Sequence, residues 1–252
     1  MMKTKVMGIV NVTPDSFSDG GEYIHPEEAV KRVRKLIAEG ADVIDIGAES
    51  TRPDAQPITW QEEWARLSPV LEGLKKEGLS PKNGGTVPIS IDTYHPETAE
   101  LALEWGAGMI NCVFEGSVPD MLKICARKCA EIVIPVHFLG TVPSEKVGSV
   151  PVNVGSVPCY IDPMIGFGTS REQDLELLRS IPELARKGRV LVGASRKRIV
   201  KKLTGEKVLG KNLGGNLAIA VWCAMKGASM VRVHDVAETV QALKVVEALD
   251  GD

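Results

Sequence analysis

No stretch of the sequence approaches the roughly 18 consecutive apolar residues that a membrane-spanning helix needs. Net charge is also small, because 30 Lys and Arg against 33 Asp and Glu leave a formal charge of −3, which gives no global attraction to nucleic acid or membrane surfaces. The five cysteines are odd in number and irregularly spaced, which is typical of reduced thiols rather than of a disulfide scaffold. We therefore expect a cytoplasmic protein with neither nucleic acid nor membrane as a partner.

Short apolar runs alternate with amphipathic stretches along the chain. The apolar runs stand at 5–11, 42–47, 87–92, 109–113, 131–137, 159–163, 189–195 and 230–235. Helical spacing of apolar residues marks 26–40, 60–78, 96–107, 118–130, 170–181, 214–228 and 236–249. Strands buried on both faces predict a parallel sheet covered by helices. Eight such units in about 250 residues favour a closed (β/α)8 TIM barrel in a single domain, 1–252. An open doubly wound sheet is the alternative, since periodicity cannot show closure.

The segment that follows the fifth predicted strand is irregular. Residues 138–158 are rich in Gly, Pro, Val and Ser and show no helical period. Proline and β-branched residues disfavour a helix there, so we expect the fifth helix to be missing or replaced by an extended loop. An unrecognised helix is the alternative. We further predict that the valines of 142–158 cover the outer face of the fifth and sixth strands in its place.

Every predicted strand ends in polar or charged residues. In chain order these are Asn11, Asp45, Asp92, Asn111, His137, Asp162, the run 195–197, and Arg232 with His234 and Asp235. Any one of them could be an ordinary helix cap or turn former. Eight in register at the carboxyl ends of barrel strands indicate a functional site, because βα loops carry the chemistry of this fold.

The first two of these loops are long, polar and rich in small residues. They read "VTPDSFSDGG" (12–21) and "GAESTRPDAQP" (47–57). Two such loops beside one pocket predict lids that exclude water and complete a site, although loops are commonly polar without any such role.

Several motifs carry a family resemblance. "GIVNVTPDSFSDGG" (8–21) and "DIGAESTRP" (45–53) closely resemble the two signatures of the dihydropteroate synthase family. Further matches follow in family order at 90–93, 110–111, 162–168, 193–197 and 232–236. The resemblance implies an eight-stranded α/β barrel, in agreement with the periodicity.

The resemblance also implies an activity. Members of the family are transferases of folate biosynthesis and targets of sulfonamides. They condense 6-hydroxymethyl-7,8-dihydropterin pyrophosphate with p-aminobenzoate to give 7,8-dihydropteroate and pyrophosphate, with Mg²⁺, and form homodimers through their C-terminal helices. Two alternatives are a pterin-binding homologue with weak or no synthase activity and a reduced-folate methyl transferase of the same barrel family. The first loop, Arg232 and His234 favour the synthase, because only pyrophosphate chemistry needs that anion site.

Matching positions suggest a role for each candidate residue. Asp92 and Asp162 would accept hydrogen bonds from the pterin. Asn111 would donate and accept, and Lys197 would donate. Arg232 and His234 would supply positive charge to the pyrophosphate, and Asn11 would help to hold Mg²⁺. The p-aminobenzoate would lie among Phe17, Thr51, Arg52, Pro53, Phe167 and Lys197. The resemblance thus implies that Asn11, Asp92, Lys197, Arg232 and His234 carry the reaction.

Three positions depart from the family pattern. Cys112 stands where the family usually has an aspartate after the strand-four asparagine, so the site loses one carboxylate. Val136 and Phe138 flank His137 where methionines are usual, which changes packing more than hydrogen bonding.

Overall fold

The computed structural model describes residues 3–13, 25–50, 55–79, 87–141, 153–154, 156–206, 208 and 211–251. Its parallel strands stand in the order β5-β4-β3-β2-β1-β9-β8-β7, and pairing of β5 with β7 closes them into a barrel. The strands are β1 (Lys5–Asn11), β2 (Val43–Gly47), β3 (Ile89–Asp92), β4 (Met109–Asn111), β5 (Glu131–Pro135), β7 (Val157–Asp162), β8 (Arg189–Val192) and β9 (Met230–Val233). The predicted closed barrel is confirmed, and the open doubly wound sheet is wrong.

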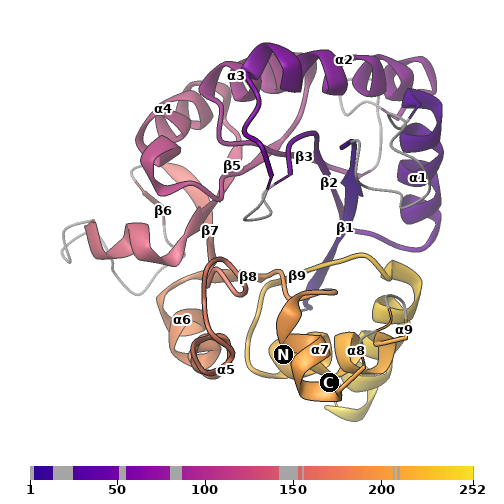
Figure 1. Cartoon of the computed structure of the whole chain (residues 1–252), viewed down its shortest axis with the longest axis vertical. Coiled ribbons are helices and arrows are strands. Elements are labelled where there is room, and N and C mark those ends of the chain that lie inside the picture. The colour runs from indigo at the N-terminus through magenta and orange to yellow at the C-terminus, as the bar shows by residue number, and fades with distance from the viewer. Residues whose placement is uncertain are drawn as a thin grey trace.

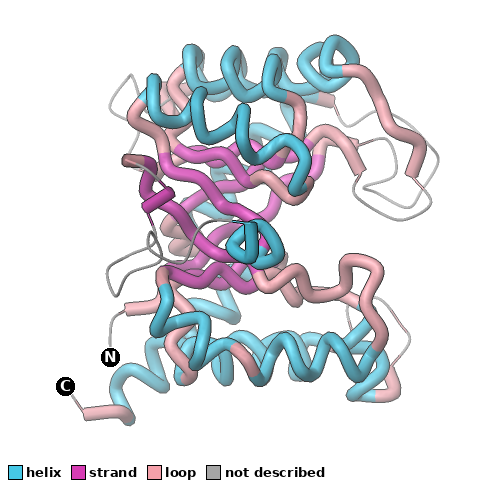
Figure 2. Tube along the Cα trace, turned by 90° about the vertical axis from the view of Figure 1, so that its left-hand side faces the viewer, coloured by secondary structure: helices cyan, strands magenta, loops and turns pink. Residues whose placement is uncertain are grey.

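Helices surround the strands on the outside (Figure 1), and the side view shows them flanking the barrel (Figure 2). They are α1 (Pro26–Ala38), α2 (Trp60–Lys76), α3 (Pro96–Trp105), α4 (Val118–Lys128), α5 (Arg171–Arg179), α6 (Ile181–Lys187), α7 (Arg198–Thr204), α8 (Leu213–Met225) and α9 (Val236–Leu249). Among the described residues, the 3-10 helices are η2 (Glu115–Ser117) and η3 (Val136–Thr141). In the described part of the chain, no helix is long and apolar enough to cross a membrane.

Side chains of the barrel divide into two apolar groups. The larger lies between the strands and the helices and includes Ile44, Ile46 and Ile110. The smaller fills the barrel interior and consists of Met7, Val43, Met109, Val133, Tyr160, Leu191 and Met230. Because side chains alternate along a strand, the residue two positions after Val43 faces the interior again, one step nearer the carboxyl end. That residue is Asp45, so the apolar plug closes the bottom of the barrel and leaves polar side chains above it.

The fifth unit lacks an α-helix among its described residues. After β5 the chain forms η3, and β6 (Asn153–Val154) then pairs antiparallel with the start of β7. Outward-facing Ile132, Ile134 and Ile161 are nevertheless fully buried, and α4 contacts both β5 and β7. The expected absence of a regular fifth helix therefore holds for the described residues. Residues 142–152 lie outside them, so the predicted cover by their valines stays a prediction.

Candidate active site

A buried polar cluster forms the floor of the barrel mouth. Arg232 on β9 donates from Nε to Asp45 Oδ2 and from Nη2 to Asp92 Oδ2, each at 2.6 Å. Asn111 Nδ2 donates to the same Asp45 oxygen at 3.1 Å. The side chains of Asp45 and Asn111 are buried, and that of Asp92 is 13% exposed. We call these four residues the polar floor; they bring β2, β3, β4 and β9 together at one point.

Strand register places Asp92 and Asn111 at one level, together with Gly47 of β2. Gly47 pairs with Asp92, and Asp92 pairs with Asn111. A Cβ at Gly47 would lie 3.2 Å from the Cβ of Asp92, a close approach that only glycine leaves unstrained. The glycine of "DIGAESTRP" therefore makes room for the carboxylate on the neighbouring strand.

The polar floor is electrostatically balanced by its arginine. Burial raises the pKa of Asp92 to about 7, although Arg232 pulls it downward. Burial lowers the pKa of Arg232, but Asp45 and Asp92 outweigh that effect and raise it, so the guanidinium stays charged. With Nε and Nη2 engaged, Nη1 is left without a partner among the described residues. The arginine that was expected to bind pyrophosphate thus also holds the two carboxylates in place.

Asp45 was not among the predicted site residues, although the sequence marks it as a strand end. It is fully buried and accepts from both Arg232 and Asn111. The signal for it was an aspartate in the middle of the apolar run 42–47, since a buried carboxylate needs a charged or hydrogen-bonding partner.

The second part of the site lies around Lys197, directly after β8. Lys197 Nζ donates to the carbonyl oxygen of Ile165 at 2.6 Å and stands 4.2 Å above the ring of Phe167. Burial lowers the pKa of Lys197 to about 8, while Asp162 pulls it upward. Burial in turn raises the pKa of Asp162, and Lys197 opposes that rise. The structure thus brings together Lys197, Phe167 and Asp162, which the sequence predicted at one end of the barrel.

Asp174 holds the loop that carries Phe167, and sequence reasoning missed it. It is fully buried on α5, and its Oδ1 accepts from the Gly166 amide at 2.8 Å and from the Thr169 hydroxyl. An acidic residue in the first turn of a helix is commonplace because it complements the helix dipole, so the sequence offered no signal that this one is buried.

His234 differs from its expected role as a positive charge. Burial, together with Arg196 and Arg232, lowers its pKa to about 3, so the imidazole of the ligand-free chain is neutral at pH 7. The Ser195 hydroxyl accepts from the His234 amide at 3.3 Å and lies 3.0 Å from Nδ1. The hydroxyl can donate its proton to Nδ1 or accept one from it, and in the first case the imidazole proton lies on Nε2. The neutral imidazole of His234 offers a hydrogen-bond donor, and its role toward pyrophosphate stays a prediction.

Cys112 does not join the polar floor. It is buried in the apolar cluster between strands and helices, and its Sγ donates to the Phe114 carbonyl oxygen at 3.4 Å. Burial raises the pKa of the thiol to about 12, so it stays neutral. The structure therefore gives no carboxylate or thiolate at this position.

Asn11 ends β1 at the rim of the mouth with its side chain exposed. The next amide, of Val12, donates to the Gly47 carbonyl oxygen at 2.7 Å and fixes the chain there. Phe17, Thr51, Arg52 and Pro53 lie outside the described residues. Of the expected p-aminobenzoate contacts, the structure therefore places Phe167 and Lys197.

The described residues contain no group of three or more His, Cys, Asp or Glu side chains that could hold a metal ion. A resident metal centre built from such ligands is therefore not found within them.

Comparison with known proteins agrees with this geometry. A family model described as "Pterin binding enzyme" matches residues 7–149 and 145–234. A dihydropteroate synthase of Synechocystis is 36% identical over 269 residues, which cover 98% of this chain and 90% of that protein. The structure of Xanthomonas albilineans dihydropteroate synthase with 4-aminobenzoic acid has a TM-score of 0.85 and 38% identity, covering 99% of this chain and 94% of that one. The same Xanthomonas enzyme in complex with 7,8-dihydropteroate gives a TM-score of 0.83 and 35% identity, covering 99% and 95%.

Proposed function

The chain belongs to the dihydropteroate synthases of the pterin-binding enzyme family, and from that premise we propose how its barrel mouth acts. The reaction condenses 6-hydroxymethyl-7,8-dihydropterin pyrophosphate with p-aminobenzoate and releases 7,8-dihydropteroate and pyrophosphate. The observation that carries the proposal is the polar floor of Asp45, Asp92, Asn111 and Arg232, buried above an apolar plug and beside Lys197.

The floor suits a pterin ring, which presents N–H donors and a carbonyl acceptor along one edge. Ionised carboxylates accept hydrogen bonds, so Asp92 and Asp162 would take the donors. Lys197 carries protons for the carbonyl acceptor, and Asn111 can donate and accept. Each carboxylate already faces a cation in the free chain, so little reorganisation accompanies binding.

The chemical step forms a bond between the aniline nitrogen and the pterin methylene while the bond from that methylene to the diphosphate oxygen breaks. The electron pair leaves with pyrophosphate, and the proton lost by the nitrogen passes to water. Positive charge that develops on the pterin is stabilised by Asp92 and Asp45, which are fixed in advance by Arg232. The free Nη1 of Arg232 and the Nε2 proton of His234 are donors for the departing diphosphate.

A magnesium ion would fit this site only as a companion of the diphosphate. Asn11 offers one neutral amide oxygen at the rim, and Mg²⁺ commonly takes one or two protein oxygens and completes its shell with phosphate oxygens and water. When bound, such an ion would supply positive charge to the diphosphate.

The function is tested by mixing purified protein with the dihydropterin pyrophosphate, p-aminobenzoate and Mg²⁺. We expect one 7,8-dihydropteroate and one pyrophosphate per turnover. A pterin that binds but is never converted would favour a binding protein instead.

Pterin affinity should depend on pH with a maximum between about 7 and 8. Below about 7 Asp92 takes up a proton and loses its acceptor character, and above about 8 Lys197 loses its charge. Affinity should therefore rise with pH through the pKa of Asp92 and fall through that of Lys197. Calorimetric titrations from pH 5.5 to 9.5 would show this, and Asp92→Asn should remove the acidic limb. A flat profile in the wild-type chain would contradict the assignment.

The proposal includes a homodimer in the cytoplasm. Apolar side chains are exposed on α8 and α9, which pack against each other: Trp222 (36%), Met225 (53%), Val245 (58%) and Leu249 (81%). Exposed apolar surface of this kind marks interaction sites. Cys112, Cys125, Cys129 and Cys223 form no disulfide in the described part of the chain, in keeping with a reducing compartment. Sedimentation should give a dimer that Met225→Glu with Val245→Glu dissociates; a wild-type monomer at micromolar concentration would contradict it.

A further inference from the structure

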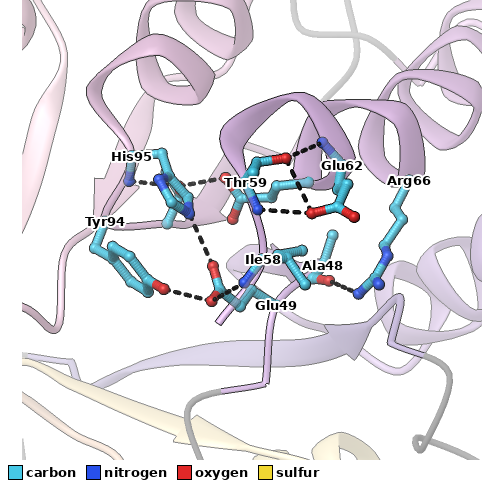
Figure 3. A network of polar contacts seen from close by, with 10 residues as sticks. Ala48, Glu49, Ile58, Thr59, Glu62, Arg66, Tyr94 and His95 are labelled. Carbon is cyan, nitrogen blue, oxygen red and sulfur yellow. Dashed lines mark hydrogen bonds and ion pairs between the residues drawn. The ribbon is translucent and has the colours of Figure 1, made fainter. Parts of the chain in front are cut away.

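A carboxylate above the polar floor collects hydrogen bonds from two neighbouring βα loops (Figure 3). Glu49 stands two residues after β2, with its side chain only 5% exposed. Its Oε1 accepts from the Tyr94 hydroxyl and from the Ile58 amide, the latter at 3.1 Å, and its Oε2 lies 2.9 Å from His95 Nε2. We call Glu49, Tyr94 and His95 the loop clasp.

The clasp fixes both ends of the second loop. The bond from the Ile58 amide to Glu49 joins two points nine residues apart along the chain. Helix α2 begins directly after, at Trp60, and its N-cap Thr59 forms a reciprocal capping box with Glu62. From the same helix Arg66 Nη1 donates to the Ala48 carbonyl oxygen at 3.0 Å. The start and the end of the loop are therefore tied to each other and to α2.

The clasp also ties this loop to the end of β3. Tyr94 and His95 follow Asp92 with only Thr93 between. The Thr93 hydroxyl donates to the fully buried Glu63 Oε2 of α2 at 2.7 Å and accepts the His95 amide at 3.1 Å. The turn that presents Tyr94 and His95 is thus anchored in the core, so it gives Glu49 a rigid support.

Position within the barrel indicates which substrate the clasp serves. The pterin would lie on the floor, and the apolar plug closes the barrel beneath it. A second substrate must therefore approach through the mouth, whose rim includes the loops that follow β2 and β3. Among the described residues, Glu49 makes no hydrogen bond to the polar floor. Its contacts therefore stabilise the loops after β2 and β3, which form the wall of the mouth above the floor, and not the pterin site.

We propose that Glu49, held by Tyr94 and His95, is a positioning residue that sets the second loop for the amine acceptor. The inference rests on the proposed function, because it assigns the wall above β2 and β3 to p-aminobenzoate. The clasp touches no reacting atom; it fixes where the loop begins and ends.

Tyr94→Phe tests this by removing a single hydroxyl, and Glu49→Ala removes the acceptor of all three bonds. The matched control is Thr4→Val, which deletes a buried hydroxyl that bonds the Ala228 carbonyl oxygen at 2.9 Å, just before β1 at the opposite end of the barrel. Tyr94→Phe should raise the KM for p-aminobenzoate on the order of three- to tenfold, the worth of one hydrogen bond. Glu49→Ala should raise it further, and the control should not. Pterin affinity should stay within about twofold in all three, since none of them touches the floor.

His95 gives a second comparison. His95→Gln keeps a side-chain donor and should lie closer to wild type in KM than His95→Ala. An unchanged KM for p-aminobenzoate in Tyr94→Phe and Glu49→Ala would overturn the proposal. A loss of pterin affinity as large as the rise in KM for p-aminobenzoate would also overturn the proposal, because the clasp would then act through Asp92.

Amide hydrogen exchange separates this inference from the proposed function. A wild-type chain without turnover would refute the function alone. The Ile58 amide should exchange faster in Glu49→Ala than in wild type or Thr4→Val, because its acceptor is gone. An unchanged exchange rate would overturn the clasp whatever the activity.

Discussion

Asp92→Asn is expected to weaken pterin binding roughly 10- to 150-fold, the equivalent of about 1.5–3 kcal/mol for a hydrogen bond to a charged group. The substitution keeps the shape of the side chain but replaces one acceptor oxygen by a donor that faces the donors of the ring. The fold should survive, because burial raises the pKa of Asp92 and its charge is therefore costly to keep. Arg232 retains Asp45 as its partner. Calorimetry gives the affinity, and thermal melting gives the stability.

Asp120→Asn is the control for this change. Asp120 makes an exposed pair with Lys123 at 2.8 Å on α4, where the same substitution should alter neither affinity nor melting temperature. Equal pterin affinity in wild type and Asp92→Asn would show that the ring does not contact this carboxylate.

Arg232→Met should destabilise the fold by about 3–5 kcal/mol, the usual result of removing one partner from a buried ion pair. The variant leaves two buried carboxylates, Asp45 and Asp92, without their shared cation. Burial already raises the pKa of Asp92, and loss of Arg232 raises it further, so the folded state binds a proton that the unfolded state releases. Stability must therefore fall as pH rises, so the deficit should be larger at pH 8 than at pH 5. Urea denaturation of the wild type and the variant at pH 5 and at pH 8 measures this deficit.

Arg34→Met provides the matched comparison. Arg34 makes two hydrogen bonds to Glu77, but its side chain is 61% exposed, and such pairs contribute about 0–1 kcal/mol. If Arg232→Met lowered the free energy of unfolding no more than Arg34→Met does, Arg232 would not be the residue that holds the polar floor together.

Local patterns sufficed to predict the barrel. Each strand is a short apolar run, and burial on both faces follows from helices outside and a plug inside. The same pattern also predicted which end of the barrel carries the polar groups, because parallel strands bring their carboxyl ends to one side. The missing regular helix after β5 was visible in the composition of 138–158, at least for its described residues.

Pairing of side chains across the barrel was not predictable in this way. The bond between Arg232 and Asp45 joins residues 187 positions apart, and the clasp joins Glu49 to residues 45 and 46 positions away. No local pattern encodes such distances. The lowered pKa of His234 could not be foreseen for a related reason, since it depends on burial and on arginines that only the fold brings near. In the sequence, Asp174 resembles an ordinary acidic residue at the start of a helix, and only the fold shows that it is buried.

A crystal structure of the chain with 6-hydroxymethyl-7,8-dihydropterin pyrophosphate bound tests the central claim most directly. The account predicts a ring edge that contacts Asp92, Asn111, Asp162 and Lys197, with the diphosphate directed toward Arg232 and Asn11. A ring seated outside the barrel mouth, or inside it without contact to Asp92 and Lys197, would contradict the account.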